Sequence, residues 1–164
     1  MVTIEIFTDG CSLNNQDKNK RVGGFGYVMR LVNGKVIPRR TGGGGKIGST
    51  NNEMELTAVI SALKRINSKF SGGVEIKTDS KYIVGGINEW IADWRNNGWQ
   101  TKSGTPVQNK NLWNTLSGEK ERLEKQGCKV DFSYIPREDN NEADNIARDY
   151  AYKIQKESAE SLPV

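Results

Sequence analysis

The first part of the chain alternates apolar and polar residues with the period of a β-strand. Residues 2–8 (V-T-I-E-I-F-T) alternate, and residues 25–31 (F-G-Y-V-M-R-L) alternate again. Asn33-Gly34 follows, the dipeptide that most strongly favours a tight hairpin, and V-I-P-R-R (36–40) begins a returning strand. The pattern therefore predicts three strands in antiparallel order.

Polar and glycine-rich segments separate these strands, and helical spacing dominates the rest of the chain. Residues 13–24 are predicted to form a loop, and the glycine run 42–45 a flexible loop or bulge. Thr50-Asn51-Asn52-Glu53 fits a capping box, which starts a helix. The elements predicted after it are a helix with apolar Leu56, Val59, Ile60 and Leu63, a strand at 74–79, a helix from Ser80, an irregular segment at 94–109, a helix around 112–123, a strand at 129–135, and a last helix around 143–154.

This order, β-β-β-α-β-α-α-β-α, predicts the fold class. Strands joined by hairpins are antiparallel, and a helix between two strands returns the chain for parallel pairing. We therefore expect an α/β fold with a mixed five-stranded sheet, three antiparallel strands followed by two parallel ones, flanked by helices. The length of 164 residues suits one domain, predicted here as residues 1–155 with a frayed tail at 156–164.

Composition narrows the possible chemistry. No histidine is present, which excludes histidine-based triads and histidine-bound zinc and leaves carboxylates as the acid, base and metal-binding groups. Cys11 and Cys128 are isolated and lack metal-ligand spacing, so we expect a reduced, cytoplasmic compartment. No apolar run is long enough to span a membrane, and the strand pattern begins within two residues, so we expect neither membrane association nor a signal peptide.

The net charge and the distribution of basic residues weakly favour a polyanionic partner. The net charge of +4 is a common surface value and favours nucleic acid only weakly. Its distribution is more informative, because two stretches of the chain carry basic residues without an acidic residue among them. These residues are Lys35, Arg39, Arg40 and Lys46 in the first stretch, and Arg95, Lys102 and Lys110 in the second.

Two aspartates occupy the same unusual position. Asp9 and Asp79 each follow an alternating strand and a threonine, and each precedes a small residue. One aspartate of this kind is usually only a turn or cap residue. If the two strands are parallel neighbours, however, both carboxylates emerge at the carboxyl edge of the sheet, where open α/β sheets place their sites.

Two helices offer further carboxylates. Asp144 lies in the first turn of the last helix, where an acidic residue also stabilises the helix dipole. Glu53 and Glu55 flank the apolar stripe of the first long helix on opposite sides, and the helical wheel does not choose between them. Four crowded carboxylates would raise one another's pKa, and divalent cations would relieve the repulsion. All-oxygen ligation favours Mg²⁺ or Mn²⁺, and two such ions about 4 Å apart can hydrolyse phosphodiesters.

Four ordered motifs, F-T-D-G-C, T-N-N-E-M-E-L, T-D-S-K-Y and N-E-A-D-N-I-A-R, resemble those of type 1 ribonuclease H from residue 2 to about residue 151. The resemblance implies an endoribonuclease that cuts the RNA strand of RNA/DNA hybrids with two Mg²⁺ ions, acting as a monomer. It places the catalytic and metal-binding carboxylates at Asp9, Glu55, Asp79 and Asp144. The resemblance thereby selects Glu55 over Glu53, a choice that the helical wheel leaves open.

The resemblance also implies which residues contact the substrate. Tryptophans in the DNA-binding channel would offer an aromatic surface that packs on deoxyribose. Gly10 would let the backbone approach the RNA, while Trp94 and Trp99 would pack the core of a protruding segment that holds the DNA strand. The other implied positions are Asn15 at the RNA strand, Asn51 and Asn52 at bases and sugars, Thr50 and Asn109 at DNA phosphates, and Trp90 and Trp113 in the DNA channel. Without the resemblance, each asparagine reads as a cap or turn residue.

The chain departs from many family members in two loops. The loop before the last helix, I-P-R-E-D-N-N-E-A-D, is short and lacks the family's histidine, so Glu138 or Asp139 either carries a proton or is a solvated charge. The loop near Asn15 is longer than usual. The alternatives to a ribonuclease H are a non-catalytic module that binds hybrid or double-stranded nucleic acid, and a related nuclease that cuts DNA or double-stranded RNA.

Overall fold

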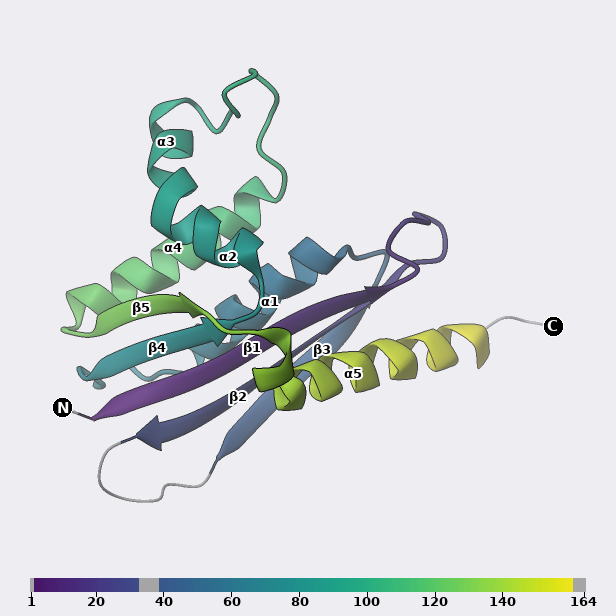
Figure 1. Cartoon of the computed structure of the whole chain (residues 1–164), viewed down its shortest axis with the longest axis horizontal. Helices are drawn as coiled ribbons and strands as arrows, with labels where there is room; N and C mark the ends of the chain where they lie inside the picture. Colours follow the sequence, from purple (N-terminus) through teal and green to yellow (C-terminus); the bar gives the residue numbers. More distant parts are fainter. Residues whose placement is uncertain (1, 33–38, 161–164) are drawn as a thin grey trace.

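A computed structural model of the chain describes residues 2–32 and 39–160. A five-stranded sheet has the order β3-β2-β1-β4-β5, and helices lie on both of its faces (Figure 1). The elements are β1 (Thr3–Leu13), β2 (Val22–Val32), β3 (Arg40–Ile47), α1 (Asn51–Lys64), β4 (Gly73–Thr78), α2 (Lys81–Gly85), η1 (Gly86–Trp90), α3 (Ile91–Asn96), α4 (Lys110–Lys125), β5 (Lys129–Tyr134), η2 (Arg137–Asp139) and α5 (Asn141–Glu160). The predicted α/β fold, with antiparallel β1–β2–β3 and parallel β1–β4–β5, is confirmed.

Strand β1 is longer than its alternating pattern predicted. It pairs with β2 along its whole length to Leu13, whereas its parallel pairing with β4 stops at Thr8–Thr78. The strand therefore does not end at Asp9, as the sequence analysis assumed. It loses one neighbour there, because β4 turns away while β2 continues beside it. Similarly, β2 begins at Val22, so the predicted loop 13–24 shortens to residues 14–21.

The glycine run 42–45 is a strand and not a loop. It forms half of β3 and pairs with β2, and helix α5 packs across β1, β2 and β3. A Cβ atom at Gly43 would lie 2.8 Å from the ring of Tyr150, and one at Gly45 would lie 2.4 Å from Ile154, and both residues belong to α5. Glycine is therefore required here by close packing of a helix on the sheet, a cause that local sequence rules do not detect.

Helices α1 and α4 cover the opposite face of the sheet (Figure 1). The predicted apolar stripe of α1 is buried, and Ile6, Tyr27 and Ile76 of the sheet join it in one hydrophobic cluster. Side chains alternate between the two faces along each strand, so in β1 and β2 the positions next to Ile6 and Tyr27 lie on the face that α5 covers. The functional consequence is that α1 and α5 approach β1 from opposite sides.

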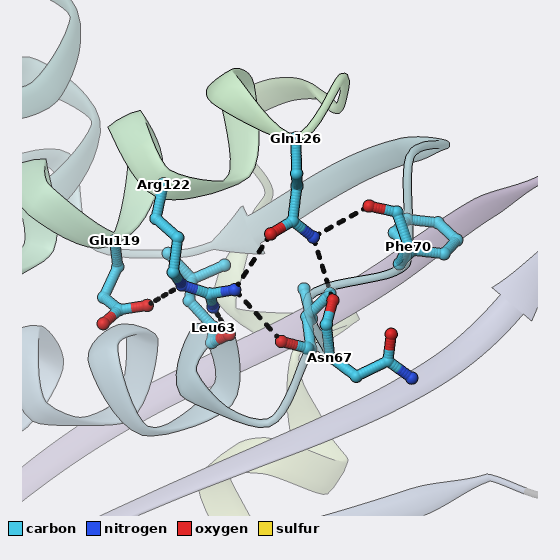
Figure 2. Close-up of polar contacts among 7 residues, drawn as sticks. Leu63, Asn67, Phe70, Glu119, Arg122 and Gln126 are labelled. Atoms are coloured by element: carbon cyan, nitrogen blue, oxygen red, sulfur yellow. Dashed lines mark hydrogen bonds and ion pairs between the residues drawn. The ribbon is translucent and has the colours of Figure 1, made fainter.

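Arg122 of α4 fastens α4 to the end of α1 (Figure 2). Its guanidinium donates hydrogen bonds to the carbonyl oxygens of Leu63 at 2.9 Å and Ile66 at 3.2 Å. Gln126, one turn later, donates to the carbonyl oxygens of Asn67 and Phe70. A cation at the carboxyl end of a helix satisfies carbonyl groups that have no partner within the helix, so this contact fixes where α1 ends.

A protruding segment extends from the sheet between α2 and α4 (Figure 1). It comprises α3 and residues 97–109, which contain one isolated β-bridge between Gln100 and Pro106. Trp94 lies at its centre, with ring centroids 5.9 Å from Trp90, 6.4 Å from Trp99 and 5.5 Å from Trp113. Trp94 and Trp99 also pack against the main hydrophobic core, whereas the sequence predicted that they pack only the small core of the protruding segment.

Two predicted features lie partly or wholly outside the described residues. The hairpin turn at Asn33-Gly34 and the start of its return strand are outside them, as are residues 161–164. The described part of the predicted frayed tail, residues 156–160, belongs to helix α5. Across the described residues, no helix is long and apolar enough to cross a membrane.

Candidate active site

Asp9 and Asp79 lie side by side at the carboxyl edge of the sheet. Their strands β1 and β4 are parallel neighbours, and their last paired residues are Thr8 and Thr78, so each aspartate is the next residue along its strand. Asp9 is 4% exposed and its backbone remains paired opposite Gly26. The prediction that these two carboxylates share one sheet edge is therefore confirmed.

Helix α1 brings Glu55 to the same place. A Cβ atom at Gly10 would lie 2.3 Å from the backbone nitrogen of Glu55, so α1 contacts β1 directly at the residue after Asp9. The side chain of Glu55 is buried, whereas Glu53 faces Lys46 at 3.5 Å on the other side of the helix. The fold thus selects Glu55. Gly10 has a packing role here that the sequence analysis did not foresee.

Asp144 completes the group from the other face of the sheet. It lies in the first turn of α5 and its carboxylate interacts with that of Asp9. Side-chain oxygens of Asp9, Glu55 and Asp79 lie within 4.8 Å of one another. Four acidic side chains from four elements that are distant in sequence therefore meet around Asp9.

The folded protein raises the pKa of two of these carboxyl groups, Asp9 and Glu55. Burial, then the contact with Asp144 and the charge of Asp79, raises the pKa of Asp9 to about 8. Burial, and the charges of Asp9 and Asp79, hold the pKa of Glu55 well above its usual value. Oxygen Oε2 of Glu55 is buried without a hydrogen-bond partner in the described part of the chain. An unpartnered oxygen among repelling carboxylates suits a divalent cation.

Polar residues surround the acidic group. Arg148 lies one turn after Asp144 and its Nε is 3.1 Å from the Asp144 carboxylate, while Nε of Arg137 is 4.0 Å from Oδ2 of Asp79. The other Asp79 oxygen, Oδ1, is 3.4 Å from the side-chain nitrogen of Asn140. Glu138 and Asp139 are exposed in η2. The loop without histidine therefore places Arg137 and Asn140 next to the carboxylates.

Three hollows adjoin one another across this surface. The first, of about 360 Å³, is lined by Asp9, Gly10, Cys11, Asn51, Asn52, Glu55, Asp79, Ser80, Tyr134 and Arg137. The second, of about 310 Å³, shares Asn51 and Asn52 with it and adds Asn15, Thr50 and Gln108. The third, also about 310 Å³, shares Tyr134 and continues to Trp90. The shared residues connect the carboxylates with most of the predicted substrate positions.

The asparagines and Thr50 have structural partners as well. The side-chain oxygen of Asn15 accepts a hydrogen bond from the backbone N–H of Asn51 at 3.0 Å, and Thr50 Oγ1 accepts one from Glu53 N–H at 3.2 Å. Asn109 adopts a left-handed conformation at φ 60° and its amide lies 3.4 Å from the hydroxyl of Tyr82. Gln108, and not Asn109, lines the hollow beside Thr50.

The two tryptophans predicted to line a DNA channel differ in position. Trp90 is 40% exposed and borders the third hollow. Trp113 is fully buried, and its indole N–H donates to the Tyr82 hydroxyl at 2.8 Å. In this structure the Trp113 ring is enclosed by Tyr82, Gly86 and Trp94, so none of its surface is available for the contact with DNA that the resemblance implies.

Several residues next to the carboxylates were not predicted as site residues: Cys11, Ser80, Tyr134 and Arg137 in the first hollow, Gln108 in the second, and the buried Asn140. Tyr134 ends β5, the third parallel strand, so the rule that singled out Asp9 and Asp79 could have found it. Gln108 and Asn140 lie in irregular segments, where no periodicity indicates which side chains face inward.

Comparisons with known proteins agree with this geometry. The family model for RNase H matches residues 2–152. A ribonuclease H of Mesorhizobium japonicum is 37% identical over 155 residues, which are 94% of this chain and 81% of that protein. Ribonuclease HI of Xylella fastidiosa is 34% identical over 151 residues, or 92% of this chain and 93% of that one.

Solved structures show the same architecture. LC9-RNase H1, a type 1 RNase H with the type 2 active-site motif, superposes with a TM-score of 0.78 at 27% identity, covering 92% of this chain and 72% of that chain. LC11-RNase H1, solved in complex with RNA/DNA hybrid, gives a TM-score of 0.62 at 23% identity, covering 92% of this chain and 98% of the other. At that identity the second likeness concerns the fold alone.

Proposed function

The chain belongs to the ribonuclease H family and is a ribonuclease H, and we propose that it hydrolyses the RNA strand of RNA/DNA hybrids with two Mg²⁺ ions. The observation that carries this proposal is the convergence of Asp9, Glu55 and Asp79, with Asp144 beside Asp9. These residues fit a pair of divalent ions, because their oxygens are close together and repel one another. LC11-RNase H1 binds an RNA/DNA hybrid in its solved complex, which supports the same substrate here.

The residues of the site would contribute to the reaction by holding the divalent ions and by contacting the phosphate of a bound strand. When bound, divalent ions lower the pKa of water and stabilise negative charge on phosphate oxygens. Asp9 interacts with the other three carboxylates and would hold the ions together with them. Arg137 is exposed next to Asp79, where its guanidinium would meet the phosphate of a bound strand.

The three connected hollows suggest how a hybrid would lie. Thr50, Asn51, Asn52 and Gln108 would contact the hybrid at the amino end of α1, where backbone N–H groups favour phosphate. Trp90 and Tyr134 would pack against the hybrid on the far side of the carboxylates. Both cysteines are free thiols, consistent with the cytoplasmic monomer that we expect.

Cleavage of matched RNA/DNA, RNA/RNA and DNA/DNA duplexes, each with Mg²⁺, Mn²⁺ or EDTA, tests the proposal. We expect cleavage of the RNA strand in the hybrid, dependent on metal. Asp9→Asn, Glu55→Gln and Asp79→Asn should each lower kcat by a factor of about 100 or more, because each removes a charged ligand.

Glu53→Gln is the matched control for Glu55→Gln, since it makes the same change two residues away on the side of α1 that faces Lys46. It should leave kcat within about twofold of the wild type. Hybrid binding without cleavage would support a non-catalytic module, and cleavage of the DNA-only duplex would support a different nuclease.

A further inference from the structure

We infer that Asn140 is a positioning residue, which holds the Asp79 carboxylate against the end of β1 and thereby sets the affinity of the site for divalent ions. This inference rests on the proposed metal-dependent function. Asn140 is 1% exposed, so it cannot touch a nucleic acid, and it precedes the first residue of α5. Any effect that it has on the reaction must therefore pass through its neighbours.

The contacts of Asn140 join three of the segments that supply carboxylates. Its side-chain nitrogen donates to the carbonyl oxygen of Thr8 at 2.9 Å and lies 3.4 Å from Oδ1 of Asp79. Its own carbonyl oxygen accepts the backbone N–H of Asp144 at 3.1 Å. One residue thus links the residue before Asp9, the side chain of Asp79 and the backbone of Asp144.

The Thr8 carbonyl explains why an amide is needed at this point. Thr8 is the last residue of β1 that pairs with β4, and a buried carbonyl group at the end of a ladder requires another donor. The two N–H groups of one amide can serve the Thr8 carbonyl and the Asp79 carboxylate together. They therefore fix the Asp79 oxygen relative to the backbone that carries Asp9.

An ordinary capping role does not account for this arrangement. A capping asparagine directs its side-chain oxygen to backbone N–H groups of the first helical turn. Oδ1 of Asn140 is instead buried without a hydrogen-bond partner among the described residues. Leaving a buried acceptor unpaired is unfavourable, so the side chain is oriented by its donor contacts with Thr8 and Asp79.

The test compares Asn140 with its neighbour Asn141, an exposed asparagine whose amide donates to the Glu138 carbonyl oxygen. Asn140→Ala and Asn141→Ala make the same uncharged change in adjacent residues, and only the first removes a donor to Asp79. For each variant, calorimetric titration with Mg²⁺ or Mn²⁺ and the rise in Tm on adding Mg²⁺ report metal affinity without using activity.

We expect Asn140→Ala to weaken metal binding by about tenfold or more, as loss of a residue that orients a ligand usually does. Asn141→Ala should stay within about twofold. In cleavage assays, the Mg²⁺ concentration for half-maximal rate should rise in Asn140→Ala, while KM for the hybrid should change little. Asn140→Ser, which keeps a hydroxyl donor, gives an intermediate case if Asn140→Ala does not fold.

Two results would overturn the inference in different ways. If the Asn140 variants have a lower Tm but bind Mg²⁺ as tightly as the wild type, Asn140 is only a structural residue and the proposed function stands. If the wild type itself binds no divalent ion, the proposed metal-dependent function fails, and the inference fails with it.

Discussion

Asp9 combines two properties that seldom coexist in a stable strand. It is an ionisable side chain held at 4% exposure, and its backbone is paired in the middle of β1. Its nearest charged neighbours, Glu55, Asp79 and Asp144, have the same sign. A residue of this kind weakens the fold unless a cation is bound, so we expect the site to lower the stability of the metal-free protein.

This expectation can be tested by changing the pH. Between pH 3.8 and about 8, folded Asp9 keeps a proton that the unfolded chain has released. The folded state therefore binds more protons, and the free energy of unfolding falls as the pH rises through this window. In EDTA, Asp9→Asn should raise the free energy of unfolding at pH 8 by an amount on the order of 2–4 kcal/mol, with little effect near pH 4.

Urea denaturation at several pH values measures this effect. Asp149→Asn, in an exposed aspartate of α5, is the control and should change the free energy of unfolding by no more than about 0.5 kcal/mol. Equal stability of Asp9→Asn and the wild type at pH 8 would show that Asp9 is not destabilising.

The packing of α5 on the sheet is the element-level feature on which the site depends. Gly24, Gly26, Gly43 and Gly45 line the sheet surface beneath this helix, and its first turn carries Asp144. A Cβ atom at Gly24 would lie 2.0 Å from the Ala147 carbonyl oxygen and 2.7 Å from the Ala151 nitrogen. Backbone atoms cannot move aside as a side chain can, so the helix itself would have to shift.

Gly24→Ala should therefore lower the free energy of unfolding by about 1–3 kcal/mol, the usual cost of overpacking, and should also reduce cleavage because Asp144 moves with α5. Gly118→Ala is the matched control, since Gly118 lies within α4 and no atom lies within 4 Å of its Cβ position. That variant should be more stable by about 0.5–1 kcal/mol. Urea denaturation and hybrid cleavage check both variants, and wild-type stability in Gly24→Ala would contradict the close contact.

Over the whole molecule, folding changes the charge pattern that the sequence suggested. The basic stretches contain no acidic residue, yet the fold brings acidic residues to them from elsewhere. Arg39 pairs with Glu142, Lys46 lies 3.5 Å from Glu53, and Arg95 lies 2.8 Å from Glu121. The net charge of +4 is therefore less concentrated on the hybrid-binding side than the linear sequence indicates.

Glu121→Gln tests this masking. It should free Arg95 for a phosphate, tighten hybrid binding at low salt, and steepen the slope of log K against log salt by roughly 0.7–0.9, the value for one phosphate contact. Glu157→Gln changes the net charge equally but lies near the carboxyl end of α5, away from the protruding segment (Figure 1). Binding titrations at several salt concentrations compare the two, and identical slopes would refute the masking.

Pattern alone was enough to predict the order of most strands and helices and to single out Asp9 and Asp79. Alternation and helical spacing report which face of an element is apolar, and that information identifies the elements. The matching positions of Asp9 and Asp79 predicted that they meet if their strands are parallel neighbours, and the structure shows this pairing. The choice of Glu55 over Glu53 needed the family resemblance.

Which residues face the site, and which are buried behind it, depends on how distant segments pack in the folded chain. Trp90 and Trp113 look equivalent in the sequence, yet one is exposed and the other enclosed. The glycine run became a strand because α5 lies against it, and Asn140 reaches Thr8, 132 residues away in sequence. Local pattern cannot encode these outcomes, because burial and close approach depend on which distant segment packs against each residue.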